Sequence, residues 1–448
     1  MASIQVWMLR IQGANIRDHN AMVDPSVSGI VSSHIASMSA PTDQFQTKMD
    51  TNDIKQNDIP KDQPTLVRWY MDVRRWDEKY FDLPLLETLT QPDQAAVKKY
   101  YQTSDKRLSL ASQLLKYYYI HQATGTPWSK IEIQRTPMPE NRPFYDSSLD
   151  FNVSHQAGLT LFAGTRAATA HSLSSGPQTL PRVGIDVACV DEPSRRRANR
   201  PPKTLADLAT FVDVFSDVLS LRELATIKNP YATLKLAREL GLNKSDPSKD
   251  DQEVLAAYGI RLFYSIWALK EAYLKMTGDG LLASWIKDLE FTNVVPPEPV
   301  QTVGFAGDPS ATHAPSVQNW GRPYSDVKIS LRGIPDHSVR VQLVGFESDY
   351  IVATAASGPN IGSVSRQVVV NDSDHHLPGR ITAFDSETGL QNVRIPPIAL
   401  RSIGDGDPWR VDSKISDPWL PMQEVDIEID IRPCADGRCE HLRDLPSF

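Results

Sequence analysis

Three short stretches of the chain carry side chains suited to phosphate and metal chemistry. "FNVSHQAG" sets Ser154 beside His155 at the end of an apolar run. "VGIDVACV" places Asp186 within an apolar run, and "WALKEAYLKM" spaces Glu271 and Lys275 four residues apart. Read alone, the first stretch is compatible with a nucleophile and its base, a phosphate clamp, or the ordinary end of a hairpin.

The stretch around Asp186 reads as a β-strand with two distinct faces. Because side chains alternate along a strand, one face carries Val183, Ile185, Val187 and Cys189, and the other carries Gly184, Asp186 and Ala188. A carboxylate flanked by small residues suits a metal ligand in a cleft. The alternative is a solvent-facing aspartate on a half-buried strand.

The stretch around Glu271 reads as an amphipathic helix. Its apolar stripe comprises Leu262, Ile266, Leu269, Tyr273 and Met276. Trp267, Glu271 and Lys275 follow one another at four-residue spacing and share a different face. A surface ion pair between the two charges would contribute only about 0.3–0.5 kcal/mol. The bulky Trp267 beside them favours a partly enclosed face instead.

Together these residues suit a magnesium-assisted phosphoryl transfer. An aspartate on a strand and a glutamate on a helix can share a hard cation that takes its other ligands from phosphate oxygens. A nearby lysine can neutralise charge on the transferring group. Ser154 and His155 then read as donors to a phosphate, helped by the upstream cations Lys98, Lys99, Arg135 and Arg142. A serine hydrolase is disfavoured, because Gly-x-Ser-x-Gly and an acid for a triad are not evident.

The elements that must position these residues form two similar series. We expect strands at 66–76, 151–154, 159–165, 182–190, 326–331, 339–347 and 350–356, and helices at 106–122, 205–227 and 258–278. The order strand, helix, strands occurs twice, with the junction near 170–182. This predicts two similar α+β halves packed together. In the C-terminal part, "VDIEIDI" at 425–431 reads as one further strand.

Composition narrows the class of protein. The 448 residues are 40% hydrophobic, and the net charge of -8 argues against general nucleic-acid binding. Three cysteines, Cys189, Cys434 and Cys439, favour a reducing compartment. With only His441 nearby, Cys434 and Cys439 read as incidental surface thiols rather than a zinc site. The sequence contains no apolar run long enough for a membrane helix, so a cytoplasmic protein is expected.

The three motifs, in this order, resemble the larger, surfactin-synthetase-activating type of 4'-phosphopantetheinyl transferase. "FNVSHQAG" resembles the family's Asn-x-Ser-His motif, "VGIDVACV" its Gly-Ile-Asp motif, and "WALKEAYLKMTGDGL" its Trp-x-x-Lys-Glu-Ala-x-x-Lys motif. "RTPMPENRPFYD" resembles the loop that meets the coenzyme. The resemblance runs from about Leu66 to Ala356, and the long insertions are similar to those of fungal members.

The resemblance implies a reaction and a fold. Phosphopantetheine passes from coenzyme A to a serine of an apo acyl or peptidyl carrier protein, and adenosine 3',5'-bisphosphate leaves. Fungal members serve fatty acid, polyketide, nonribosomal peptide and lysine-pathway carriers. The implied fold is α+β, with two pseudo-symmetric halves and the active site in the cleft between them, and a monomer fits such a chain.

The resemblance also implies roles for individual residues. Asp186 and Glu271 match the Mg²⁺ ligands, and Lys275 matches the lysine that contacts the pyrophosphate and supports proton removal. The expected contacts to coenzyme A are Lys99, Arg135, Arg142, Asn152, Ser154, His155 and Lys275. Lys98 can substitute for Lys99 near the 3'-phosphate. Many members carry a second acid two residues after the aspartate, where this chain has Ala188, and members of the human type also lack it.

The expected organisation has four parts: a polar lead-in at 1–64, an N-terminal half at 65–175, a C-terminal half at 183–358, and a largely irregular extension at 359–448. The competing hypothesis is a non-catalytic module that binds coenzyme A or a carrier protein. The presence of both Asp186 and Glu271 favours the enzyme.

Overall fold

The structure is a computed structural model of the chain. It describes residues 66–76, 82–138, 140–166, 181–191, 201–244, 248, 250–280, 283–300, 319–358, 361 and 417–439, together with the backbone of 380–385 and 389–394. The expected lead-in at 1–64 lies outside the described residues.

The N-terminal half is a sheet covered by one long helix. Its strands are β1 (Leu66–Asp72), β4 (Leu149–Gln156) and β5 (Leu159–Arg166), and its helix is α4 (Thr103–Thr124). The sheet order is β14-β1-β5-β4, in which β14 is Trp419–Glu424. The helix ends at Gly125, whose φ of 71° suits a glycine cap. Smaller elements of this half are η1 (Val73–Arg75), η2 (Leu86–Thr88), α3 (Gln91–Lys98), η3 (Trp128–Lys130), β2 (Gln134–Arg135) and β3 (Pro143–Phe144).

The C-terminal half repeats this plan. Its strands are β6 (Arg182–Cys189), β10 (Val339–Phe346) and β11 (Tyr350–Ser357), and its helix is α9 (Gln252–Thr277). The helix begins where the Asp251 side chain accepts from the Val254 N–H, and it ends at Gly278. Smaller elements are α6 (Leu205–Asp213), α7 (Leu221–Lys228), α8 (Tyr231–Glu239), η5 (Ile286–Asp288), β7 (Leu289–Thr292), β8 (Lys328–Leu331) and β9 (Ile334–Pro335).

The two halves share one topology, and this confirms the α+β class. In each half the first strand precedes the long helix and a pair of strands follows it. In each, the first strand pairs antiparallel with the last, which pairs with the middle one, giving β1-β5-β4 and β6-β11-β10. The expected helix at 205–227 is wrong in one respect: residues 214–220 interrupt it, and Ser220 starts α7 with its own capping box.

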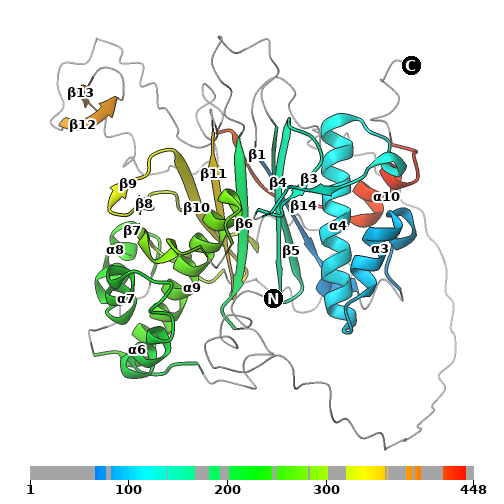
Figure 1. The fold of residues 1–448 in the computed structure, drawn as a ribbon. Coiled ribbons are helices and arrows are strands. Elements are labelled where there is room, and N and C mark those ends of the chain that lie inside the picture. Colours follow the sequence, from blue (N-terminus) through cyan, green and yellow to red (C-terminus); the bar gives the residue numbers. More distant parts are fainter. Residues whose placement is uncertain are drawn as a thin grey trace, which may run out of the picture.

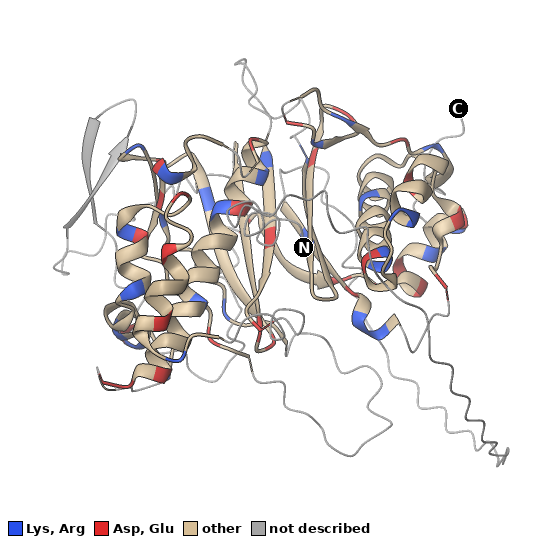
Figure 2. Cartoon of the chain, turned by 60° about the horizontal axis from the view of Figure 1, so that its bottom comes forward, with Lys and Arg blue, Asp and Glu red and all other residues tan. Residues whose placement is uncertain are grey.

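The halves pack sheet against sheet, with the helices outside (Figure 1). An apolar layer between the sheets includes Leu161, Val183, Ile185 and Val352. A second apolar cluster lies between the N-terminal sheet and α4, and a third lies between the C-terminal sheet and α9. Lysines, arginines, aspartates and glutamates are interspersed over the helices of both halves (Figure 2). Among the described helices, none has the length and apolar character to cross a membrane.

The end of the described chain returns to the N-terminal half. β14 (Trp419–Glu424) pairs parallel with β1, and the π-helical turn η8 (Ile427–Ile431) and α10 (Arg432–Ala435) follow it. A strand at 425–431 was therefore the wrong expectation. Asp426 accepts hydrogen bonds from the Glu428 and Ile429 backbone N–H groups, and these local contacts start a helical turn. A separate hairpin comprises β12 (Arg380–Asp385) and β13 (Gly389–Arg394).

Candidate active site

The two halves meet at their edge strands β4 and β6, where side chains of β4 form a ladder of hydrogen bonds with the backbone of β6. Polar residues recur at every second position of β4, so they share the face turned toward β6. Asp150, Asn152, Ser154 and Gln156 accept from the backbone N–H groups of Val183, Ile185, Val187 and Cys189, at 2.7, 3.1, 3.4 and 3.0 Å. The ladder satisfies the edge of β6 and fixes its register against β4.

Asp186 lies beside this ladder, in contact with Ser154 and Lys275. The Ser154 hydroxyl donates to Asp186 Oδ1 at 2.9 Å, and Lys275 Nζ donates to the same oxygen at 2.7 Å. Lys275 Nζ also contacts Ser154 Oγ at 2.9 Å. Three residues from β4, β6 and α9 thus form one cluster, although they are far apart in the sequence. Asp186 is only 6% exposed, so it is not the solvent-facing aspartate of the alternative reading.

Glu271 reaches the same region because α9 packs very close to β6. A Cβ at Gly184 would lie 2.0 Å from the Ala272 carbonyl oxygen, so only glycine permits this approach. Glu271 precedes Lys275 by four residues on α9 and therefore faces the same side of the helix. It is 4% exposed, and Lys275 pairs with Asp186, so these two charges do not lie on a solvent-exposed face of the helix.

Arg142 fastens the C-terminal end of α9 to both edge strands. Its Nη2 lies 2.9 and 2.8 Å from the two carboxylate oxygens of Asp150 and 3.0 Å from the Val183 carbonyl oxygen. It also donates to the carbonyls of Lys275 and Met276, the second at 2.8 Å. A cation at this end of a helix satisfies terminal carbonyls and complements the helix dipole. In this structure Arg142 therefore holds the position of Lys275.

Lys270, next to Glu271, belongs to the core rather than to the cluster. Its ammonium lies 3.0 Å from Glu223 of α7 and donates to the Ile286 carbonyl at 3.1 Å. Both charged side chains are almost completely buried. Removing one partner of such a pair leaves an uncompensated buried charge. The pair therefore fixes the rotation of α9, which sets the direction of Glu271.

His155 faces α4, on the side of β4 opposite to Ser154. Its Nδ1 lies 3.2 Å from Ser112 Oγ, and that hydroxyl donates to the Leu108 carbonyl at 2.8 Å. The contact between Nδ1 and the Ser112 hydroxyl turns the His155 ring toward α4. Burial lowers the pKa of His155 to about 3, and the charges of Lys275 and Lys116 act in the same direction. The imidazole is neutral at physiological pH.

Lys116 also lies in this region, although the sequence did not predict it as a site residue. It lies one helical turn after Ser112 on α4, and burial lowers the pKa of its ammonium to about 8, with the charge of Arg135 adding to the effect. The four-residue spacing of Ser112 and Lys116 was the available signal. Without the position of His155, that spacing did not distinguish this face from any other polar face of the helix.

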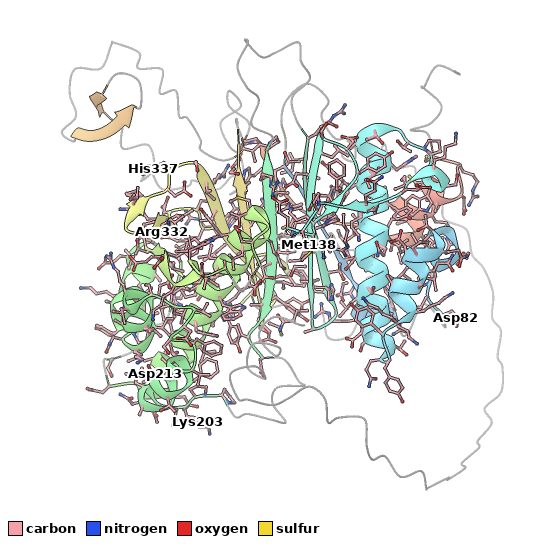
Figure 3. All side chains as sticks on the ribbon, in the orientation of Figure 1. Asp82, Met138, Lys203, Asp213, Arg332 and His337 are labelled. Atoms are coloured by element: carbon pink, nitrogen blue, oxygen red, sulfur yellow. The ribbon has the colours of Figure 1, made fainter. Side chains whose placement is uncertain are left out.

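The remaining expected residues lie toward the surface. Arg135 in β2 is exposed and donates to the Asn141 carbonyl at 2.8 Å. Lys98 and Lys99 are exposed at the end of α3, and Lys99 Nζ lies 5.2 Å from the centre of the Tyr100 ring. Met138, in the loop between β2 and β3, projects onto the junction of the halves in the view of Figure 3 and is 78% exposed.

Comparison with known families identifies the class of transferase to which a chain with this fold and this cluster belongs. Residues 74–167 match the family described as 4'-phosphopantetheinyl transferase, N-terminal. Residues 182–329 match the 4'-phosphopantetheinyl transferase superfamily. The chain belongs to this superfamily and is an enzyme of the 4'-phosphopantetheinyl transferase class.

Individual relatives include fungal members of the superfamily. It is 38% identical over 410 residues to 4'-phosphopantetheinyl transferase A of Aspergillus fumigatus, a match covering 86% of this chain and 98% of the relative. It is 39% identical over 395 residues to 4'-phosphopantetheinyl transferase NpgA of Emericella nidulans, covering 85% and 96%. The human L-aminoadipate-semialdehyde dehydrogenase-phosphopantetheinyl transferase is 23% identical over 221 residues, covering 48% and 57%. The likeness to the fungal proteins extends beyond residues 66–356.

Proposed function

We propose that the cluster at the junction of β4, β6 and α9 transfers 4'-phosphopantetheine from coenzyme A to a serine of an apo carrier protein. The serine oxygen bonds to the phosphorus on the pantetheine side, and the bond from that phosphorus to the bridging oxygen breaks. Adenosine 3',5'-bisphosphate leaves, and the hydroxyl proton passes to solvent. The contact of Lys275 with Asp186, beside the buried Glu271, is the observation that carries the proposal.

Asp186 and Glu271 have the donor chemistry of a magnesium site. Both are carboxylates, and Mg²⁺ prefers a few carboxylate oxygens with phosphate oxygens and water completing its shell. The contacts of Asp186 with Ser154 and Lys275 both use Oδ1, so Oδ2 suits a cation. Ala188 packs in the apolar cluster beneath α9 and adds no third carboxylate. When bound, Mg²⁺ would neutralise the charge of the pyrophosphate.

Lys275 contributes a fixed positive charge. Its ammonium is held by Asp186 and Ser154, and Arg142 and Arg182 fasten the end of the helix that carries it. A charge fixed in this way stabilises the pyrophosphate and the serine oxygen as it loses its proton. Because the charge is already oriented, little reorganisation accompanies the reaction.

His155 is proposed to contact the 3'-phosphate, in a basic region with Lys116, Arg135 and Lys99 or Lys98. His155→Ala should weaken the binding of coenzyme A more than that of dephospho-coenzyme A, since a charge-assisted hydrogen bond contributes about 1.5–3 kcal/mol. Titration calorimetry measures both affinities. Equal weakening of the two ligands would place His155 away from that phosphate.

Two other functions make different predictions. A non-catalytic module would bind coenzyme A or a carrier without changing the carrier's mass. A serine hydrolase would keep its activity in EDTA and lose it on Ser154→Ala. The contacts of Ser154 with Asp186 and Lys275, rather than with a histidine base, favour the transferase. We further propose that the enzyme acts as a cytoplasmic monomer, because one chain supplies both halves of the site.

The test is the mass of an apo carrier protein incubated with the enzyme, coenzyme A and Mg²⁺. The proposal predicts a gain of one phosphopantetheine group, which EDTA abolishes and which a carrier lacking the acceptor serine does not show. Carriers from fatty acid, polyketide, nonribosomal peptide and lysine pathways establish the range of partners. An unchanged carrier mass in the presence of bound coenzyme A would support the binding module instead.

A further inference from the structure

A second group of metal-binding side chains lies in the N-terminal half and is not used by the transfer reaction. His121 of α4 meets Cys434 of α10 and Cys439, although more than 300 residues separate them from it. The ligating atoms of the three residues all lie within 4.8 Å of one another. They are 0%, 1% and 6% exposed, so the cysteines are not the surface thiols expected from the sequence.

The orientation of His121 is that of a metal ligand. Its Nδ1 lies 2.8 Å from the Thr126 carbonyl oxygen, which only accepts hydrogen bonds, so Nδ1 carries the proton. The lone pair of Nε2 is therefore directed toward Cys439 Sγ, 3.1 Å away. A histidine that donates one ring N–H to a carbonyl and offers the other nitrogen is the usual arrangement in metal sites.

The distances suit a small tetrahedral ion after a slight adjustment. With zinc–sulfur bonds of about 2.3 Å and zinc–nitrogen bonds of about 2.0 Å, a tetrahedral ion separates its sulfur and nitrogen ligands by about 3.5 Å. The observed 3.1 Å between Nε2 and Cys439 Sγ is slightly shorter, and the three ligating atoms all lie within 4.8 Å of one another. A lengthening of about 0.4 Å brings this pair to the tetrahedral separation.

We propose that His121, Cys434 and Cys439 bind one zinc ion, which fastens the C-terminal segment to α4. Two thiolates and an imidazole select zinc over the magnesium that the carboxylates at the junction suit. The two cysteines enclose a tight turn in which Gly437 has a φ of 68°, so both sulfurs reach the same histidine. A fourth ligand position remains for water or another group.

The site explains how the last described segment is retained against the N-terminal sheet. α10 lies beside α4, and β14 of the same segment extends the sheet next to β1 (Figure 1). Cys434 and Cys439 belong to the apolar cluster beneath α4. Because zinc binds thiolates, binding must displace the thiol protons and should weaken as the pH falls.

Metal analysis of the full-length, untagged protein tests the proposal. After dialysis against micromolar zinc and then buffer, we expect about one zinc per chain, and Co²⁺ in its place should give sulfur-to-cobalt charge-transfer absorption. Cys439→Ser and His121→Gln should each lower zinc content several-fold. Cys189→Ser is the matched control, because Cys189 is also buried but lies on β6, outside this group, and its substitution should leave the zinc content unchanged.

Two further measurements keep the proposal testable if a variant does not fold. Thermal unfolding of the wild-type protein should shift to higher temperature with zinc and to lower temperature with a chelator. Thiol titration of the denatured wild type should find three thiols. Less than a tenth of a zinc per chain, no charge-transfer band and an unchanged midpoint would overturn the proposal. A single titratable thiol that becomes three on reduction would also overturn it, in favour of a disulfide.

Discussion

Replacing Gly184 with alanine tests whether the close approach of α9 to β6 positions the site. The new Cβ would lie 2.0 Å from the Ala272 carbonyl oxygen and 2.5 Å from the Met276 nitrogen. Ordinary van der Waals contact begins at 3.4 Å, so the strand and helix must separate by about 1.4 Å, the difference between 3.4 and 2.0 Å. Both obstructing atoms belong to the backbone, so no side-chain rotation relieves the contact.

The expected loss is large in both stability and rate. Overpacking of this kind costs about 1–3 kcal/mol, and a contact between two backbones belongs at the upper end, about 3 kcal/mol. The same separation moves Lys275 and Glu271 away from Asp186. A displacement of about 1 Å in an active site lowers the rate roughly 100-fold. Urea unfolding measures the first quantity, and single-turnover transfer to an apo carrier measures the second.

Gly345→Ala is the matched control, because Gly345 also lies in a strand of the C-terminal sheet. Its new Cβ would lie 3.1 Å from the Pro297 Cβ and 3.3 Å from the Glu298 carbonyl oxygen, so shifts of a few tenths of an ångström suffice. We expect a loss of about 1 kcal/mol or less and a rate within twofold of the wild type. If Gly184→Ala behaved like Gly345→Ala, the close approach would not position the site.

Two further predictions concern buried charges. Lys270→Met should lower the free energy of unfolding in urea by about 3–5 kcal/mol, because Glu223 loses its buried partner. The control Lys98→Met, at the surface, should change this free energy by less than about 0.5 kcal/mol. Equal effects of the two substitutions would contradict a buried pair. His155 has a pKa of about 3 in the folded protein, against about 6.5 in the unfolded chain. Its contribution to stability is therefore complete above pH 6.5 and is lost progressively as the pH falls from 6.5 to 3. His155→Gln should make the free energy of unfolding depend less on pH over this range. An unchanged slope of that free energy against pH would show that His155 is not buried as a neutral ring.

Local periodicity was sufficient to predict the strand and helix that carry the proposed transfer residues. Alternation along β6 placed Val183 and Ile185 on the face opposite to Asp186, and the apolar layer between the sheets confirms this. Four-residue spacing on α9 placed Glu271 and Lys275 on one side. The polar residues at every second position of β4 were also visible, but their partners are backbone groups of β6, which the sequence of β4 does not specify.

Contacts across long sequence separations could not be predicted in this way. Cys434 and Cys439 were interpreted as surface thiols because only residues close in the sequence were considered as partners. Their partner His121 lies on α4, more than 300 residues earlier in the chain. The strand expected at 425–431 failed for a local reason, since the Asp426 side chain caps a turn that a β-like alternation does not reveal. Arg142 was assigned to the coenzyme loop from the resemblance, and its contacts with Asp150 and the end of α9 became visible only in three dimensions.

We propose that Asp186 serves the transfer reaction as a charged carboxylate. Asp186→Asn tests it most directly, because the amide keeps the size of the side chain and an oxygen that can accept from Ser154 but removes the charge. The assay is the single-turnover rate at which an apo carrier gains the mass of phosphopantetheine at saturating Mg²⁺ and coenzyme A. We predict that the variant, with a wild-type circular dichroism spectrum, loses at least about 100-fold in rate, or about 2.7 kcal/mol. A folded variant that kept more than about a tenth of the wild-type rate, a loss below about 1.4 kcal/mol, would contradict the account.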